Sequence, residues 1–229
     1  MAKAGDKLYN PVQRDWIVFG QTAEDTSGEL MSGELVVPPS VGNPLHVHPL
    51  QEEHFEVLSG TFGVQIGDER RSLGEGEEAT VPPGTPHRWF NEDDQQEVRV
   101  SVELRPALNS ETFFETAYGL ARDGKTDENG VPNLLQQAVT LNGINKGEIY
   151  LASPPVPVQK ALLAAIAPVG RLLGYKDQYP KYSAAETPSG EGAGPPSTTS
   201  VMARAVTMAT SLLVASLFLL GKMRRRGKG

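Results

Sequence analysis

The sequence predicts a mainly β protein: a small antiparallel β-barrel, then a helical extension and a C-terminal transmembrane segment. Three observations support this fold class. The 229 residues include 24 Gly and 18 Pro, which favours turns and short strands over long helices. Hydrophobic residues make up 38% of the chain, which suffices for one core. The apolar runs of the first half are short and closely spaced, as in sandwiches and barrels.

Nine short apolar or alternating runs in the first half of the chain are candidate strands. Turn residues separate several of them. Gly67 and Asp68 suit a tight hairpin, and Pro82, Pro83 and Gly84 force another turn. The predicted strands are residues 16–21, 29–37, 46–48, 53–59, 62–66, 69–73, 79–81, 87–91 and 97–104.

Beyond residue 107 the apolar residues adopt helical spacing. Asn109 or Ser110 can cap the first of three helices. Pro132 suits the first turn of the second, and Pro168 should kink the third. The third helix is expected to dock on the barrel or at a dimer seam, and the alternative is a position in a membrane interface. The predicted helices are residues 110–122, 132–141 and 158–174.

The last part of the chain changes composition twice. Residues 183–200 contain no large apolar side chain and are expected to form a flexible linker. Residues 205–221 form an uncharged run of 17 residues. As a helix this run spans about 26 Å, slightly less than a hydrocarbon core of about 30 Å. Extended to residues 201–221, it predicts a single-pass membrane anchor that leaves the barrel in the cytosol, and a docked helix is the alternative.

Charge and cysteine content exclude several classes of function. The formal net charge is −7, and five of the Lys and Arg residues lie within the last eight residues, so the body is strongly acidic. An acidic body disfavours a nucleic-acid partner. The chain has no Cys, which excludes disulfides, thiolate zinc sites and cysteine nucleophiles. Any metal must be held by imidazole and carboxylate.

All four histidines fall within two short segments, and these segments carry the candidate chemistry. In a strand, His46 and His48 point to the same face, so two imidazoles can chelate one ion. Glu53 begins the next strand and can return a carboxylate to that face. His87 follows a Pro-x-Gly turn that would place it on a neighbouring strand facing the same interior. His54 follows Glu53 directly, so it should face away, toward the surface.

The first segment resembles the first motif of the cupin superfamily. This motif is His-x-His, four residues, Glu, six residues and Gly, and it matches at His46, His48, Glu53 and Gly60. The upstream glycine departs from the family pattern, because Gly42 leaves three residues before the first histidine where the family has five.

The second segment resembles the second cupin motif at every defined position. Only 15 residues separate the two motifs, as in compact single-domain type-2 cupins. The matching positions are Gly76, Pro82, Gly84, His87 and Asn91.

The resemblance implies a small antiparallel cupin (jelly-roll) barrel with a metal centre. The implied ligands of one divalent metal ion are His46, His48, Glu53 and His87. Imidazole and carboxylate without thiolate suit Fe(II), which we favour, as well as Mn, Ni, Co or Zn. Glu53 could leave the metal to act as the catalytic general base.

An apolar wall is predicted beside the metal. Phe55 and Val57 share the face of Glu53, and Trp89 shares the face of His87. These three side chains are candidates for the substrate pocket, and the alternative is that they are simply barrel core.

The metal centre that the resemblance implies favours a metal-dependent oxidoreductase, dioxygenase-like. The predicted apolar pocket suits an aromatic small molecule as its substrate, and the predicted membrane anchor suits a lipophilic one. The alternatives are a metal-dependent isomerase, cyclase or decarboxylase without net oxidation, and a non-catalytic ligand-binding cupin. A homodimer is also expected by resemblance. The predicted divisions are an N-terminal segment (1–14), the cupin barrel (15–107), the helical extension (108–182), the linker (183–200), the transmembrane anchor (201–221) and a basic tail (222–229).

Overall fold

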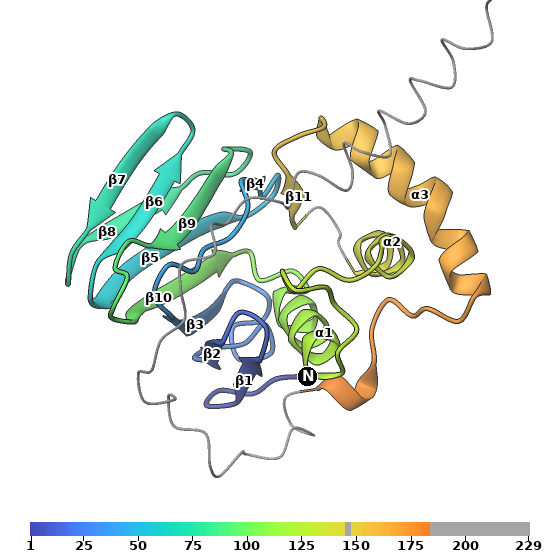
Figure 1. The fold of residues 1–229 in the computed structure, drawn as a ribbon, viewed down its shortest axis with the longest axis horizontal. Coiled ribbons are helices and arrows are strands. Elements are labelled where there is room, and N and C mark those ends of the chain that lie inside the picture. Colours follow the sequence, from blue (N-terminus) through green and yellow to red (C-terminus); the bar gives the residue numbers. More distant parts are fainter. Residues whose placement is uncertain (145–147, 184–229) are drawn as a thin grey trace, which may run out of the picture.

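The computed structural model describes residues 1–144 and 148–183. Within these ranges, two antiparallel β-sheets form one side of the molecule and three α-helices form the other (Figure 1). The chain is therefore mainly β in its first half and helical in its second, as the sequence predicts.

The larger sheet has six strands, in the order β1-β2-β3-β10-β5-β8. In β3 and β10 every second residue is buried, because successive side chains of a strand point to opposite faces and one face covers the core. Antiparallel pairing of β10 with both β3 and β5 places it inside the sheet. The strands are β1 (Lys7–Asn10), β2 (Asp15–Phe19), β3 (Met31–Val37), β5 (Glu52–Ser59), β8 (Glu78–Val81) and β10 (Val98–Arg105).

The smaller sheet has five strands, in the order β11-β4-β9-β6-β7. Its β6–β7 hairpin turns at Gly67, whose φ of +59° lies in the region that favours glycine. The strands are β4 (His46–Val47), β6 (Phe62–Ile66), β7 (Glu69–Leu73), β9 (His87–Asn91) and β11 (Tyr150–Leu151).

The main core lies between the two sheets. Phe55 of β5 and Phe62 of β6 meet there with ring centroids 5.2 Å apart, and both are fully buried. In the described part of the chain neither sheet closes on itself, since each keeps two edge strands. The predicted barrel is therefore corrected to an open two-sheet sandwich of jelly-roll type.

The predicted strands agree with the observed ones to within two residues at each end, and three have identical bounds: β6, β7 and β9. Strands β1 and β11 are not among the predicted strands. The second of these has two residues and pairs with β4, about a hundred residues earlier in the chain. A strand this short carries no alternation of its own, so only its distant partner defines it.

The predicted helices also agree to within two residues at each end. Asn133 caps α2, because its side-chain oxygen accepts from the backbone N–H groups of Leu135 and Gln136. The side chain of Asn109 makes no such cap for α1 and instead donates to the carbonyl of Ile144. The helices are α1 (Ser110–Arg122), α2 (Leu134–Gly143) and α3 (Val156–Leu172), followed by the 3-10 helix η1 (Pro180–Tyr182).

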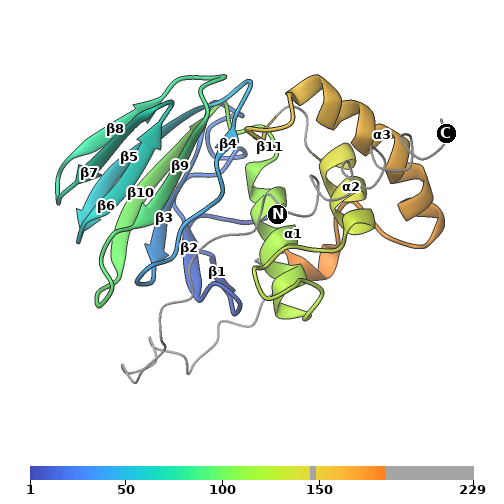
Figure 2. The same ribbon diagram turned by 45° about the horizontal axis from the view of Figure 1, so that its top comes forward.

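A second, smaller core joins the helices to the five-stranded sheet (Figure 2). Val47 of β4 and Tyr150 of β11 pack there against Ala138 of α2 and Leu163 of α3. Strand β4 therefore contacts the helical extension through Val47, which lies between His46 and His48.

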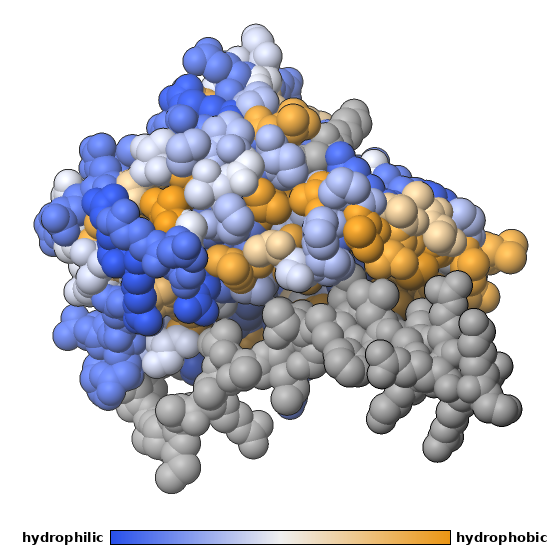
Figure 3. Space-filling view, turned by 90° about the horizontal axis from the view of Figure 1, so that it is seen from above, coloured by the Kyte–Doolittle hydropathy of each residue, from blue (hydrophilic) through white to orange (hydrophobic). Residues whose placement is uncertain are grey.

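The outer face of α3 carries exposed apolar side chains (Figure 3). Leu172 is 87% exposed and Leu173 is 64% exposed. A position in a membrane interface is the alternative that the sequence leaves open for this helix, beside docking on the barrel or at a dimer seam.

The predicted membrane localisation is corrected by this structure. Among residues 1–144 and 148–183 no helix is long and apolar enough to cross a membrane. The longest of them, α3, has 17 residues and includes Lys160 and Arg171, whereas a span needs about 20 mostly apolar residues. The predicted anchor over 201–221, the basic tail over 222–229 and residues 184–200 of the predicted linker lie outside the described residues.

Candidate metal centre

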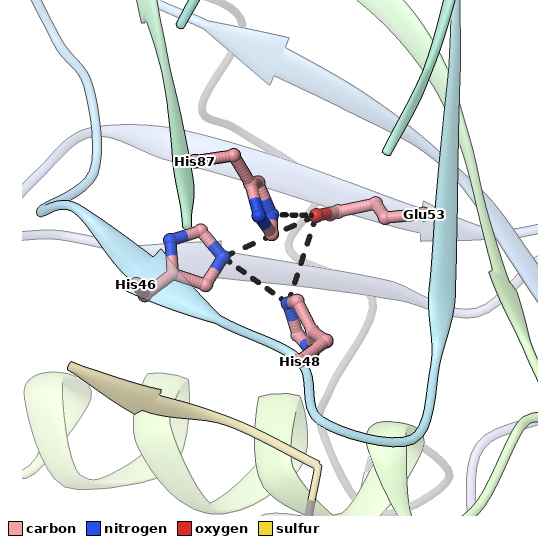
Figure 4. A group of neighbouring side chains, drawn as sticks. All are labelled: His46, His48, Glu53 and His87. Carbon is pink, nitrogen blue, oxygen red and sulfur yellow. Dashed lines mark hydrogen bonds and ion pairs between the residues drawn. The ribbon is translucent and has the colours of Figure 1, made fainter. Parts of the chain in front are cut away.

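The four predicted ligand residues come together between the two sheets (Figure 4). His46 lies on β4, His48 directly after it and His87 on β9, all from the five-stranded sheet, whereas Glu53 comes from β5 of the six-stranded sheet. Each offers one ligand atom, these atoms all lie within 4.8 Å of one another, and all four residues are buried.

Strand geometry explains why these side chains meet. Alternation along β4 turns Val47 toward the helices and the two histidines toward the sandwich interior. Pairing of β4 with β9 sets His46 directly opposite His87. The N–H of Gly84, in the turn before β9, donates to the carbonyl of His48 at 2.8 Å. This hydrogen bond holds the turn that precedes His87 next to the segment of His46 and His48.

The ligand atoms lie at short distances from one another. Nε2 of His87 lies 2.7 Å from Oε2 of Glu53, and Nε2 of His46 lies 3.1 Å from Nε2 of His48. The same Glu53 oxygen lies 3.6 Å from Nε2 of His48 and 4.0 Å from Nε2 of His46.

In each imidazole Nδ1 faces away from the other ligand atoms, and its hydrogen-bond partner fixes the tautomer. Nδ1 of His46 lies 3.0 Å from the carbonyl oxygen of Pro44, and Nδ1 of His87 lies 2.9 Å from that of Thr85. A carbonyl can only accept, so each Nδ1 carries a proton. Nε2 of His46 therefore turns a lone pair inward, whereas Nε2 of His87 shares a proton with the carboxylate of Glu53. Nδ1 of His48 faces a side-chain oxygen instead, at 3.3 Å.

This donor set fits a divalent cation. Once the proton between His87 and Glu53 is displaced, three imidazole lone pairs and a carboxylate converge. The lone pairs of His46 and His48 repel each other at 3.1 Å unless a positive charge lies between them. Two nitrogens bound at right angles, each about 2.1 Å from one ion, lie about 3 Å apart. The group could therefore hold a metal ion without large rearrangement.

Burial and mutual charge set the protonation of the group. Burial lowers the pKa of His46 to about 3, and it also lowers the pKa of His48. Burial opposes the charge of Glu53, but the hydrogen bond with His87 and the nearby histidines outweigh it and lower the pKa of this carboxyl. Burial likewise opposes the charge of His87, and its hydrogen bond with Glu53 outweighs this and raises the pKa. A metal therefore has to displace the proton shared by His87 and Glu53.

Two residues around the ligands were missed by the sequence analysis. Gln51 supplies the oxygen that faces Nδ1 of His48, and it is 1% exposed. Asn43 accepts the backbone N–H of Trp89 at 2.8 Å, which helps to fix the strand that carries His87. In the sequence, the one signal for Gln51 is its place between two predicted ligands.

The predicted pocket residues occupy two environments. Phe55 and Val57 are fully buried in the core between the sheets. Trp89 is partly buried, and its ring stacks at 6.2 Å from that of Phe62. Their role in binding a substrate stays a prediction. His54 points away from the metal group, with Nδ1 2.9 Å from Oγ1 of Thr80.

Motif residue Asn91 is structural in this fold. Its side-chain amide donates to the carbonyls of Val37 and Gln96, at 3.0 and 2.8 Å, and its oxygen accepts from the backbone of Asp93. These bonds hold the end of β9 that lies away from His87.

Comparison with known proteins gives one family and several relatives. Residues 33–103 match the family model described as "Cupin domain". An oxidoreductase of Arthrobotrys oligospora is 32% identical over 154 residues, which cover 61% of this chain and 59% of that protein. The probable oxidoreductase virH of Hypocrea virens is 32% identical over 153 residues, which cover 62% of this chain and 68% of that protein.

Among solved structures, an RmlC-like cupin from Shewanella frigidimarina aligns with a TM-score of 0.39 and 16% identity, covering 45% of this chain and 86% of that one. This likeness is too distant to bear on activity. The match to the Arthrobotrys protein leaves about two fifths of that relative without a counterpart here.

Proposed function

The chain belongs to the cupin superfamily, and from this premise we infer that it is a metal-dependent oxidoreductase acting on a small organic molecule. The buried group of His46, His48, Glu53 and His87 carries the proposal. The names of the two fungal relatives, both oxidoreductases, support the reaction class.

The metal is proposed to be one divalent ion, with Fe(II) favoured. Its ligands would be the Nε2 atoms of the three histidines and the carboxylate of Glu53. Fe(II) accepts such ligands and changes oxidation state, which an oxidoreductase requires. When bound, the ion supplies Lewis acidity and an accessible one-electron change, which together suit dioxygenase-like chemistry.

Glu53 is proposed to be the catalytic base. Its pKa is lowered, so the carboxyl is ionised at neutral pH and can accept a proton. In this proposal a substrate C–H or O–H group gives its proton to Oε2, the atom that lies 2.7 Å from Nε2 of His87. Glu53 would have to leave the ion to accept this proton, and the three histidines would keep holding the ion.

The substrate is proposed to be an aromatic or otherwise lipophilic molecule. In the sheet, Glu53 is flanked by Leu104 on one side and Val81 on the other. Trp89 lies two residues beyond His87 on the same strand and is partly buried. Apolar neighbours of this kind favour an apolar ligand beside the ion.

Oxygen uptake tests the reaction class. The full chain, reconstituted with Fe(II), is screened against phenols and enolisable aromatic ketones with an oxygen electrode. We expect uptake that depends on Fe(II), is lost in His48→Ala and is kept in His54→Ala. Turnover that continues unchanged without oxygen would point instead to an isomerase, cyclase or decarboxylase.

A further inference from the structure

We propose that Gln51 is a positioning residue of the metal centre, which holds His48 in the orientation and tautomer that ligation needs and ties it to the start of α1. This inference rests on the proposed metal function. It concerns an uncharged side chain that neither cupin motif defines.

The amide nitrogen of Gln51 is held by three oxygens from one segment. Nε2 donates to the carbonyl of Pro106 at 2.8 Å, to Oγ of Ser110 at 3.0 Å and to the carbonyl of Ala107 at 3.3 Å. The hydroxyl of Ser110 uses its own proton on Ala107, at 2.8 Å. All three oxygens therefore act as acceptors, so the nitrogen of the Gln51 amide must face them.

With the nitrogen of the Gln51 amide placed in this way, the amide oxygen points toward His48. Oε1 lies 3.3 Å from Nδ1 of His48. An amide oxygen can only accept, so Nδ1 of His48 carries the proton and Nε2 presents its lone pair to the metal group. The loop of residues 105–110 thus orients the amide that favours this tautomer of His48.

His48 differs in this respect from the other two ligands. His46 and His87 each donate to a carbonyl two residues earlier in their own segment. His48 uses partners from elsewhere: Gln51, and the backbone of Glu148 in the helical extension. Its position therefore depends on how the extension and the 105–110 loop are packed.

A second buried glutamine offers a matched control. Gln136 of α2 is 2% exposed, and its Nε2 donates to Oγ1 of Thr140 and to the carbonyl of Lys176, both at 2.8 Å. Its oxygen accepts from the hydroxyl of Tyr179 at 2.7 Å. Substituting methionine for either glutamine removes a similar set of hydrogen bonds, but only one of the two sets includes a metal ligand.

Co(II) binding is measured for the full-length wild type, Gln51→Met and Gln136→Met, by absorption titration in competition with a chelator. We expect Gln51→Met to weaken Co(II) binding about tenfold, because outer partners of metal ligands typically contribute 10- to 100-fold and Glu148 still remains. Gln136→Met should bind Co(II) like the wild type. Unchanged affinity in Gln51→Met, or equal losses in both variants, would overturn the proposal.

The imidazole tautomer gives a readout that a general loss of stability does not move. In metal-free protein with ¹⁵N-labelled histidine, the ring nitrogen shifts should report His48 protonated at Nδ1, and Gln51→Met should move His48 toward mixed tautomers while His46 and His87 stay unchanged. If this variant does not fold, Gln51→Leu removes the same oxygen and should change the His48 shifts in the same way; an unchanged His48 resonance contradicts the proposal.

The two measurements also separate the two claims. A wild type that binds no Co(II) overturns the proposed metal function, and the ring shifts still decide the role of Gln51. A wild type that binds Co(II) as tightly as Gln51→Met does overturns only the role of Gln51.

Discussion

Nε2 of His87 lies 2.7 Å from Oε2 of Glu53, although the two residues are 34 positions apart and belong to different sheets. This contact joins the sandwich halves at the metal centre. Both side chains are almost fully buried, so each compensates the desolvation of the other.

Replacing Glu53 should separate folding from metal binding. Glu53→Gln keeps the shape of the side chain and an oxygen that can face His87, but removes the negative charge that attracts the ion. We expect Co(II) affinity to fall by at least about 100-fold, with a cooperative unfolding transition retained in urea. Wild-type affinity in this variant would contradict Glu53 as a ligand.

Asp15 should make folding stability depend on pH. It lies on β2 and accepts the hydroxyl of Tyr118 of α1 at 2.6 Å, and burial raises its pKa from 3.8 to about 6. The folded state therefore holds the proton more tightly than the unfolded state, so the stabilisation present below pH 4 is lost as the pH rises through 6.

The variant Asp15→Asn cannot ionise and keeps an oxygen for Tyr118. Between pH 4 and pH 7.5 its free energy of unfolding should improve relative to the wild type by about 2.5 kcal/mol. Urea unfolding at several pH values measures this difference. Asp25→Asn is the control of opposite sign, because hydrogen bonds from Thr22 lower the pKa of that exposed carboxyl; a constant difference for Asp15→Asn would count against the assignment.

Trp89 should report a ligand that enters the metal centre. The chain has two tryptophans, and Trp16 lies on β2, where its ring lies tilted against that of Tyr9 with centroids 4.6 Å apart. In Trp16→Phe, an aromatic ligand should change the emission of Trp89. The reciprocal variant Trp89→Phe should give no change, and an equal response from both variants would place the ligand elsewhere.

The sequence determined those parts of the fold that depend on local pattern. Gly67 fixes the hairpin between β6 and β7, and both strands have the predicted bounds. Alternation placed His46 and His48 on one face, and turn chemistry placed His87 on the neighbouring strand. The four ligand residues follow from these two local rules and the family resemblance.

The parts of the fold and of the site that the sequence does not predict depend on contacts between residues far apart in the chain. Strand β11 exists because Tyr150 and Leu151 meet β4, and the sandwich stays open because β7 and β8 each pair on one side only. The role of Gln51 depends on where the 105–110 loop returns, which no spacing near residue 51 reveals. The predicted membrane anchor over 201–221 lies outside the described residues, and no helix among those that are described is long and apolar enough to cross a membrane.

The metal content of the full-length chain tests the central claim most directly. Elemental mass spectrometry is applied to the wild type, to His46→Ala/His48→Ala and to the control His54→Ala, whose imidazole points away from the group. We predict about one equivalent of a divalent metal in the wild type and in His54→Ala, and essentially none in the double variant. A wild type that stays metal-free after reconstitution with Fe(II), Mn(II), Ni(II), Co(II) and Zn(II), or a double variant that retains its metal, would contradict the account.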